Sequence, residues 1–255
     1  MSETELVRVN ASELILPKPK NKGAEMAGKR IAAIVAQLPP GVDHAAWAMA
    51  ALTEANNIDA TPVSVATCVF NLAFLGLMPG KTLGHAHFVP FKGQAQLIVG
   101  YKGWIHLAYG TGFLQSLFTD VICQGEPLEY WIDEHGPHFR HTPAFERTPE
   151  RNNIIGAYCQ YKTRDGGNGF RLINRNDIRK SDKGRDVWNS NFEAQVRKTA
   201  VLRAAPMWNT TNRLARAIEL DEQYEREESQ SLPIGMTFDG EAIPAAGYKL
   251  PLGDE

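Results

Sequence analysis

The chain has 255 residues, of which 43% are hydrophobic and 22% charged, and its formal net charge is −2. This length can bury a sizeable core in one or two domains. No stretch of about 18 apolar residues occurs, so the composition excludes a membrane-spanning helix.

The start of the chain is acidic where a secretory signal has a basic and then an apolar run. Three widely spaced cysteines suit neither a disulfide framework nor a zinc site. We therefore expect a globular protein in an intracellular, reducing compartment.

Charge is distributed unevenly along the chain. Residues 1–161 carry 12 basic and 14 acidic side chains, residues 162–216 carry 13 and 5, and residues 217–255 carry 2 and 10. This segregation indicates a basic surface for a polyanion, followed by an acidic tail. A solvated helical face and a disordered end would produce the same pattern.

The first third of the chain has helical periodicity. Residues 1–22 are polar and proline-containing, which predicts a flexible arm. Apolar residues then recur at helical spacing over residues 23–76. Within this region we expect Asp43 and Thr61 to cap helices and Gly76 to end the last one.

After residue 76 the period becomes that of strands. Two strands are expected around Lys92-Gly93, followed by a short helix from Tyr101. The later expected elements are a strand over 114–123, a hairpin of 153–162 with 169–173, a helix opened by Asn174 or Asp177, and long helices over about 190–205 and 211–228. This order predicts an α+β fold: an antiparallel β-sheet with a hairpin packed by helices, an N-terminal helical region and a flexible acidic C-terminal tail.

The expected organisation is an arm, one main domain and a tail. The arm is 1–22, the domain is 23–228 and the disordered acidic tail is 229–255. The domain divides into a helical part, 23–76, and an α+β core, 77–228.

The sequence of the segment from Gly76 to Thr82 superficially resembles a phosphate-binding loop. It has three residues between its glycines, whereas the motif requires four, and it lies between a helix and a strand instead of between a strand and a helix. It therefore indicates a turn.

The spacing of the histidines is compatible with a metal-binding site. His85 and His87 would share one face of a strand, whereas His135, His138 and His141 lie in a segment whose Gly and Pro residues predict a loop. A metal-dependent nuclease that uses these histidines stays an alternative. However, the expected strands 94–101 and 153–162 lack carboxylates, and no nucleophile motif occurs, so we expect no enzyme.

Basic residues interleaved with aromatic ones suggest a site for single-stranded nucleic acid. Lys and Arg neutralise phosphates, and aromatic faces stack on bases. The expected DNA-binding residues are Lys92, Tyr101, Lys102, Trp104, Arg175, Lys180, Lys183, Arg185, Arg197, Lys198 and Arg203. Trp104 could instead be a core anchor.

Two sequence blocks resemble the RecT family of phage single-strand annealing proteins. The first block comprises residues 75–91, which read LGLMPGKTLGHAHFVPF, and residues 96–105, which read QLIVGYKGWI. The second block contains Trp188 and the late basic segment RKTAV with Arg203, and His141-Thr-Pro also fits.

The resemblance implies ATP-independent annealing of complementary DNA strands, without bond chemistry, in phage recombination inside the bacterial cytoplasm. It implies a homo-oligomeric ring or filament that binds single-stranded DNA and annealed duplex. It further implies a 5′–3′ phage exonuclease and a host single-strand binding protein as partners. No cofactor is expected, although a divalent cation could modulate assembly.

Three further hypotheses concern assembly and the tail. The N-terminal helices would mediate contacts between protomers, with Trp47 as an anchor. The acidic tail would recruit a partner protein, mimic DNA or serve as a solubilising end. A purely structural oligomer stays the second alternative to annealing.

Overall fold

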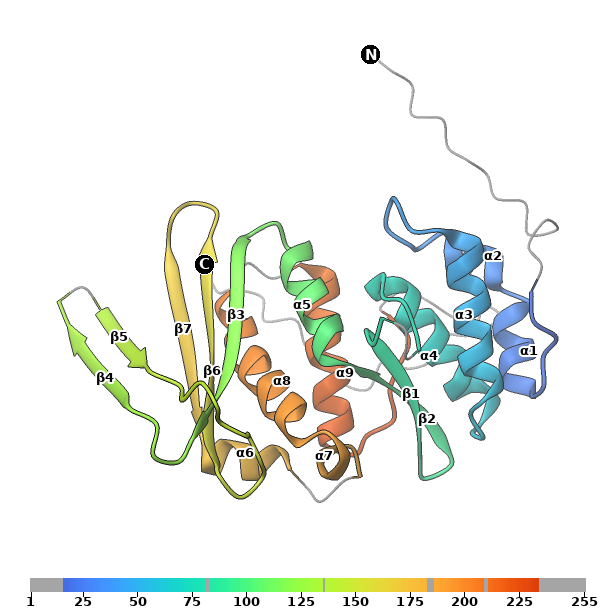
Figure 1. Ribbon diagram of the computed structural model, residues 1–255. Helices are drawn as coiled ribbons and strands as arrows, with labels where there is room; N and C mark the ends of the chain where they lie inside the picture. Colours follow the sequence, from blue (N-terminus) through green and yellow to red (C-terminus); the bar gives the residue numbers. More distant parts are fainter. Residues whose placement is uncertain (1–15, 81–82, 135, 183–185, 209–210, 234–255) are drawn as a thin grey trace, which may run out of the picture. The chain divides into compact units, whose positions relative to one another are not determined.

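The computed structural model describes residues 16–80, 83–134, 136–182, 186–208 and 211–233. It contains two compact units (Figure 1). The first comprises the described residues up to Gly100 and from Ala215 on, and the second comprises Tyr101–Leu214. Helices and antiparallel sheets occur together, so the predicted α+β class is confirmed. Within the described ranges, no helix combines the length and apolar character needed to cross a membrane.

The first unit is mainly helical. Its elements are α1 (Lys22–Gly28), α2 (Ile31–Val35), α3 (His44–Asn56), α4 (Pro62–Leu75), β1 (Ala86–Phe91), β2 (Gln94–Val99) and most of α9 (Asn212–Glu225). Helix α4 is buried along most of its length, as expected for a helix that is apolar on all sides. It begins with Pro62 and ends at Gly76, which adopts the left-handed conformation at φ 69°.

Two predicted helix caps have different outcomes. Asp43 Oδ1 accepts a hydrogen bond from the Ala46 N–H at 3.0 Å, so this cap is confirmed. Thr61 makes no side-chain cap bond, because its hydroxyl donates to Ser64 Oγ at 2.9 Å. Thr61 nevertheless occupies the predicted N-cap position, where its carbonyl accepts from the Val65 N–H at 3.1 Å, and Pro62 follows in the first turn of α4.

Helices α1 and α4 approach closely at a glycine. A Cβ on Gly23 would lie 2.5 Å from Val65 Cβ, so only glycine fits there without a shift. Nearby in the fold, Trp47 is fully buried and its Nε1–H donates to the Leu77 carbonyl at 2.8 Å. Trp47 is therefore a core residue, and the hypothesis that it anchors a neighbouring protomer is wrong.

Strands β1 and β2 form the predicted hairpin around Lys92 and Gly93. Both turn residues have positive φ, 49° and 77°, as in the tight turns that match strand twist. The turn is attached to α4, because the Gly93 carbonyl accepts from the Thr61 N–H at 2.9 Å and Ser64 Oγ accepts from the Ala95 N–H at 2.8 Å.

The chain after α9 also packs into the first unit. The Gln230 side-chain amide pairs with both backbone groups of Leu97, accepting at 2.6 Å and donating at 2.9 Å. Asn71 Nδ2 donates to the Ser231 carbonyl, and Leu232 is buried. The folded part thus extends past the expected boundary at residue 229, while the acidic tail from 234 on lies outside the described residues.

The second unit is a three-stranded sheet covered by helices. Its elements are α5 (Tyr101–Gly110), β3 (Leu114–Cys123), β4 (Leu128–Asp133), β5 (Gly136–His141), β6 (Ile154–Thr163), β7 (Asn168–Asn174), α6 (Arg175–Ser181), α7 (Asp186–Ser190), α8 (Phe192–Ala204) and the 3-10 helix η2 (Ala205–Met207). The strand order is β3–β6–β7, antiparallel throughout. The predicted hairpin β6–β7 and the Asn174 cap of α6 are confirmed.

The two faces of this sheet differ. Helix α8 packs on one face and against α5 (Figure 1), where Val121, Ala157 and Cys159 are fully buried. On the other face, Phe139 of the β4–β5 hairpin packs on Tyr158 and Phe170, with ring centroids 4.8 and 4.5 Å apart.

The β4–β5 hairpin corrects the predicted loop over residues 135–141. Gly136 and Pro137 favoured a loop, but β5 is paired only with β4 among the described strands. A proline is tolerated in such an edge strand, because one side of the strand needs no ladder hydrogen bond.

Candidate nucleic-acid interface

Several predicted cations lie exposed on helices of the second unit. Lys102 is in the first turn of α5, Lys180 in the last turn of α6 and Arg203 in the last turn of α8, all with exposed side chains. Arg175 is partly buried, and its Nη2 donates to the Ile154 carbonyl at 3.4 Å. The helices therefore present at least three cationic groups to solvent.

The other predicted cations are placed differently. Lys92 belongs to the first unit, where its Nζ lies 2.8 Å from Glu227 Oε2 and both side chains are largely exposed. An exposed pair of this kind contributes little free energy to the fold. Lys183 and Arg185 lie outside the described residues.

The two aromatic candidates differ in exposure. Tyr101 is partly exposed at the start of α5, and burial raises the pKa of its phenol. Trp104, one turn further along, is fully buried. Its ring offers no face to a base, so its position corresponds to the core alternative.

Two consecutive residues of α8 face inward. Arg197 donates to the Thr119 carbonyl at 2.6 Å and to Asp120 Oδ1 at 2.8 Å, and it also pairs with Glu193 Oε1 at 2.6 Å. Lys198 is only 7% exposed. The packing of α8 on the sheet thus turns both side chains toward the protein, and their contact with DNA stays a prediction.

Arg197 is one end of a larger ion-pair cluster, here called the Arg147 network. Arg147 pairs with Asp120 Oδ2 at 2.5 Å and with Glu126 Oε2 at 3.1 Å. Glu126 also lies 3.0 Å from His141 Nε2. The network consists of Asp120, Glu126, His141, Arg147, Glu193 and Arg197.

The Glu126 carboxyl of this network is held charged. Burial alone would raise the pKa of Glu126, but hydrogen bonds from Cys123, His141 and Ala144, together with the charge of Arg147, hold the pKa of this carboxyl below its usual range. Likewise, burial opposes the charge on Arg147, yet Asp120 and Glu126 raise its pKa. The network therefore ties the loop after β5 and helix α8 to strand β3.

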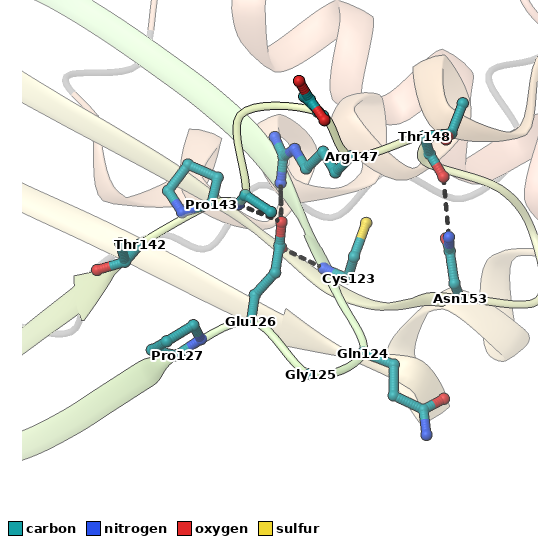
Figure 2. Close-up of a pocket in the computed structure, with 12 residues that line it drawn as sticks. Cys123, Gln124, Gly125, Glu126, Pro127, Thr142, Pro143, Arg147, Thr148 and Asn153 are labelled. Atoms are coloured by element: carbon teal, nitrogen blue, oxygen red, sulfur yellow. Dashed lines mark hydrogen bonds and ion pairs between the residues drawn. The ribbon is translucent and has the colours of Figure 1, made fainter.

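A pocket of about 570 Å³ lies over this network (Figure 2). Figure 2 shows Arg147 and Glu126 facing each other there, with Glu126 also bonded to the Cys123 N–H. Glu146 also lines the pocket, so two carboxylates face one guanidinium there and the net charge of the lining does not attract a phosphate.

Sequence reasoning missed Arg147, Asp120 and Glu126. His141-Thr-Pro was noted as part of the resemblance, but nothing in the sequence linked it to Glu126. In the described ranges, no group of three or more His, Cys, Asp or Glu side chains is placed to hold a metal ion.

Fold and surface thus define an α+β protein with two compact units and solvent-facing cations on the helices of the second unit. The chain belongs to the RecT family, whose profile matches residues 44–233.

The chain is similar to two curated relatives. It is 30% identical over 176 residues to Protein RecT of Escherichia coli (strain K12), covering 63% of each chain. It is 30% identical over 177 residues to the uncharacterized protein YqaK of Bacillus subtilis (strain 168), covering 65% of this chain and 58% of YqaK. The matches therefore span less than two thirds of these relatives' lengths.

Proposed function

We propose that this protein binds single-stranded DNA and anneals complementary strands without ATP, in phage-type homologous recombination in the bacterial cytoplasm. Membership of the RecT family carries this proposal, because the match extends over both compact units. Annealing needs no bond chemistry, so the proposal requires no catalytic residue and no cofactor.

The exposed cations support the DNA-binding part of the proposal. Lys102, Lys180 and Arg203 are predicted DNA-binding residues with exposed side chains and would contact phosphates, and Lys92 would join them by releasing Glu227. Of the two predicted aromatic residues, Tyr101 is the one whose partly exposed side chain could contact a base. Lys183 and Arg185 stay candidates from the sequence.

Assembly and partners belong to the same proposal. The protein would act as an oligomeric ring or filament on single strands and on the annealed duplex. A phage 5′–3′ exonuclease would supply the single strand, and the host single-strand binding protein would be displaced from it. The acidic residues after 233 would contact one of these proteins.

An annealing assay tests the proposal. Purified protein without ATP is mixed with two labelled complementary oligonucleotides, and energy transfer reports pairing while electrophoresis reports the length of the DNA. Faster pairing of complementary strands, with intact DNA, supports annealing. Degradation that stops on addition of a chelator would support the nuclease alternative, and the absence of DNA binding would support a structural oligomer.

A further inference from the structure

The β4–β5 hairpin exposes an unusual amount of apolar surface. Leu128, Tyr130 and Ile132 are 40, 54 and 69% exposed, and they lie on one face because side chains alternate along a strand. Trp131, on the opposite face, is 42% exposed. Among the described residues, four of the eleven exposed large hydrophobic side chains are thus in β4.

The hairpin also has unused backbone edges. Every residue of β4 is exposed, and β4 and β5 pair only with each other among the described strands (Figure 1). Phe139 and Tyr130 contact Phe170 of the three-stranded sheet, with ring centroids 4.5 and 6.3 Å away, but Ile132 near the end of β4 is left 69% exposed. An exposed apolar side chain on an unpaired strand edge gains stability when another surface covers it. The hairpin therefore has the properties of an interaction surface.

Its charge favours a protein partner over DNA. Residues 128–141 contain three acidic side chains, Glu129, Asp133 and Glu134, and one basic side chain, Arg140. Two of the acids follow Ile132 directly at the tip. Phosphates would be repelled there, even though Trp131 could stack on a base.

The first unit carries a complementary surface. A pocket of about 280 Å³ is lined by apolar side chains that include Leu16, Pro17, Pro19 and Leu52. This volume is large compared with the roughly 30 Å³ that one water molecule occupies in the liquid. It can therefore admit a large side chain.

The surroundings of this pocket are basic. Residues 16–30 contain five basic side chains, Lys18, Lys20, Lys22, Lys29 and Arg30, and one acidic side chain, Glu25. Glu25 lines the pocket and pairs with Lys29 at 2.7 Å, so the acidic side chain of this segment already faces one of its cations. Lys18, Lys20 and Lys22 are exposed.

We propose that the β4–β5 hairpin of one copy docks on the pocket of residues 16–30 and Leu52 of a second copy, with Ile132 entering the pocket and the acidic tip facing its lysines. The contact joins two different surfaces of the same chain, so it propagates from copy to copy into a ring or filament. This inference deepens the proposed function and rests on its assembly part, for which it names the two surfaces.

Assembly of the full chain on an oligonucleotide, followed by mass photometry, tests the contact. Ile132→Asp should raise the protein concentration needed for half-assembly by about tenfold or more, as expected for an anchor at the centre of an interface. Met207→Asp is the control, because Met207 is 66% exposed but distant in sequence from either surface. If Ile132→Asp, Met207→Asp and the unmodified protein all reach half-assembly at the same protein concentration, the inference is overturned.

A charge exchange tests the pairing itself. One variant carries Glu129→Lys, Asp133→Lys and Glu134→Lys, and the other carries Lys18→Glu, Lys20→Glu and Lys22→Glu. Each alone should fail to assemble, whereas an equimolar mixture should assemble into alternating oligomers, because each hairpin then meets a pocket of opposite charge.

The outcomes separate this contact from the annealing proposal. A mixture that stays unassembled, or single variants that assemble normally, would overturn the contact while leaving annealing by the unmodified protein untouched. If the unmodified protein forms no oligomer on DNA, both the contact and the assembly part of the proposed function are wrong. If Ile132→Asp lowers the affinity for DNA but leaves assembly unchanged, the hairpin binds DNA and not a second copy.

Discussion

Replacing Arg147 with Met should destabilise the second unit strongly. The side chains of Arg147, Asp120 and Glu126 are 15, 10 and 5% exposed, so the substitution leaves two buried carboxylates without their shared cation. Breaking a buried ion pair from one side costs about 3–5 kcal/mol. We expect about 3 kcal/mol, the low end, because Asp120 keeps Arg197 and Glu126 keeps the Cys123 N–H.

The loss should depend on pH. In the unmodified protein the pKa of Glu126 is lowered in the folded state, so its contribution is present above the unfolded pKa and is lost as pH falls through the folded pKa. Without Arg147, one of the groups that lower this pKa is gone, so the pKa of Glu126 should rise toward its usual range while the hydrogen bonds from Cys123, His141 and Ala144 still lower it. The deficit of Arg147→Met should therefore be largest near neutral pH and should shrink toward about pH 5.

Urea unfolding followed by circular dichroism, at neutral pH and near pH 5, measures both effects. Arg140→Met is the matched control, since Arg140 lies 3.8 Å from Glu129 and both side chains are more than 60% exposed. That exposed pair should contribute at most about 1 kcal/mol. If Arg147→Met costs no more than Arg140→Met, or if its deficit is the same at both pH values, the Arg147 network does not stabilise the fold as described.

Two further expectations concern α8 and the first unit. Arg203→Ala should lower the slope of log affinity for single-stranded DNA against log salt by about 0.7 to 1. Arg197→Ala should leave this slope unchanged and lower the free energy of unfolding by about 2 kcal/mol. A salt titration and urea unfolding measure the two effects, and equal slopes for the two variants would contradict the assignment. Gly23→Ala should lower the free energy of unfolding in urea by about 1–3 kcal/mol, because its Cβ would meet Val65. Gly28→Ala, with no atom within 4 Å of the added Cβ, should leave this free energy unchanged or raise it. Similar free energies of unfolding for the two variants would show that the α1–α4 contact adjusts freely.

Elements with strong local signals were predictable from the sequence. The Lys92-Gly93 turn, the ends of α4 at Pro62 and Gly76, and the Asn174 cap each depend on residues that lie within a few positions of one another. Their conformations follow from the chemistry of those residues, with little contribution from the rest of the fold.

The β4–β5 hairpin and the Arg147 network were not predictable in this way. Asp120 contacts Arg147, 27 residues away, and Arg197, 77 residues away. The sequence does not show which residue a basic side chain contacts. Arg197 and Arg203 therefore cannot be distinguished as DNA-binding candidates until α8 is placed on the sheet. Only the packing shows that the first faces a carboxylate and the second faces solvent.

The rate of ATP-free annealing tests the central proposal most directly when the unmodified protein is compared with a variant carrying Lys102→Ala, Lys180→Ala and Arg203→Ala. The unmodified protein should accelerate the pairing of complementary strands and not of unrelated ones, and the variant should lose this acceleration while keeping its circular dichroism spectrum and its urea midpoint. Equal acceleration by a folded variant would contradict the assigned interface. The absence of acceleration by the unmodified protein would contradict the annealing function itself.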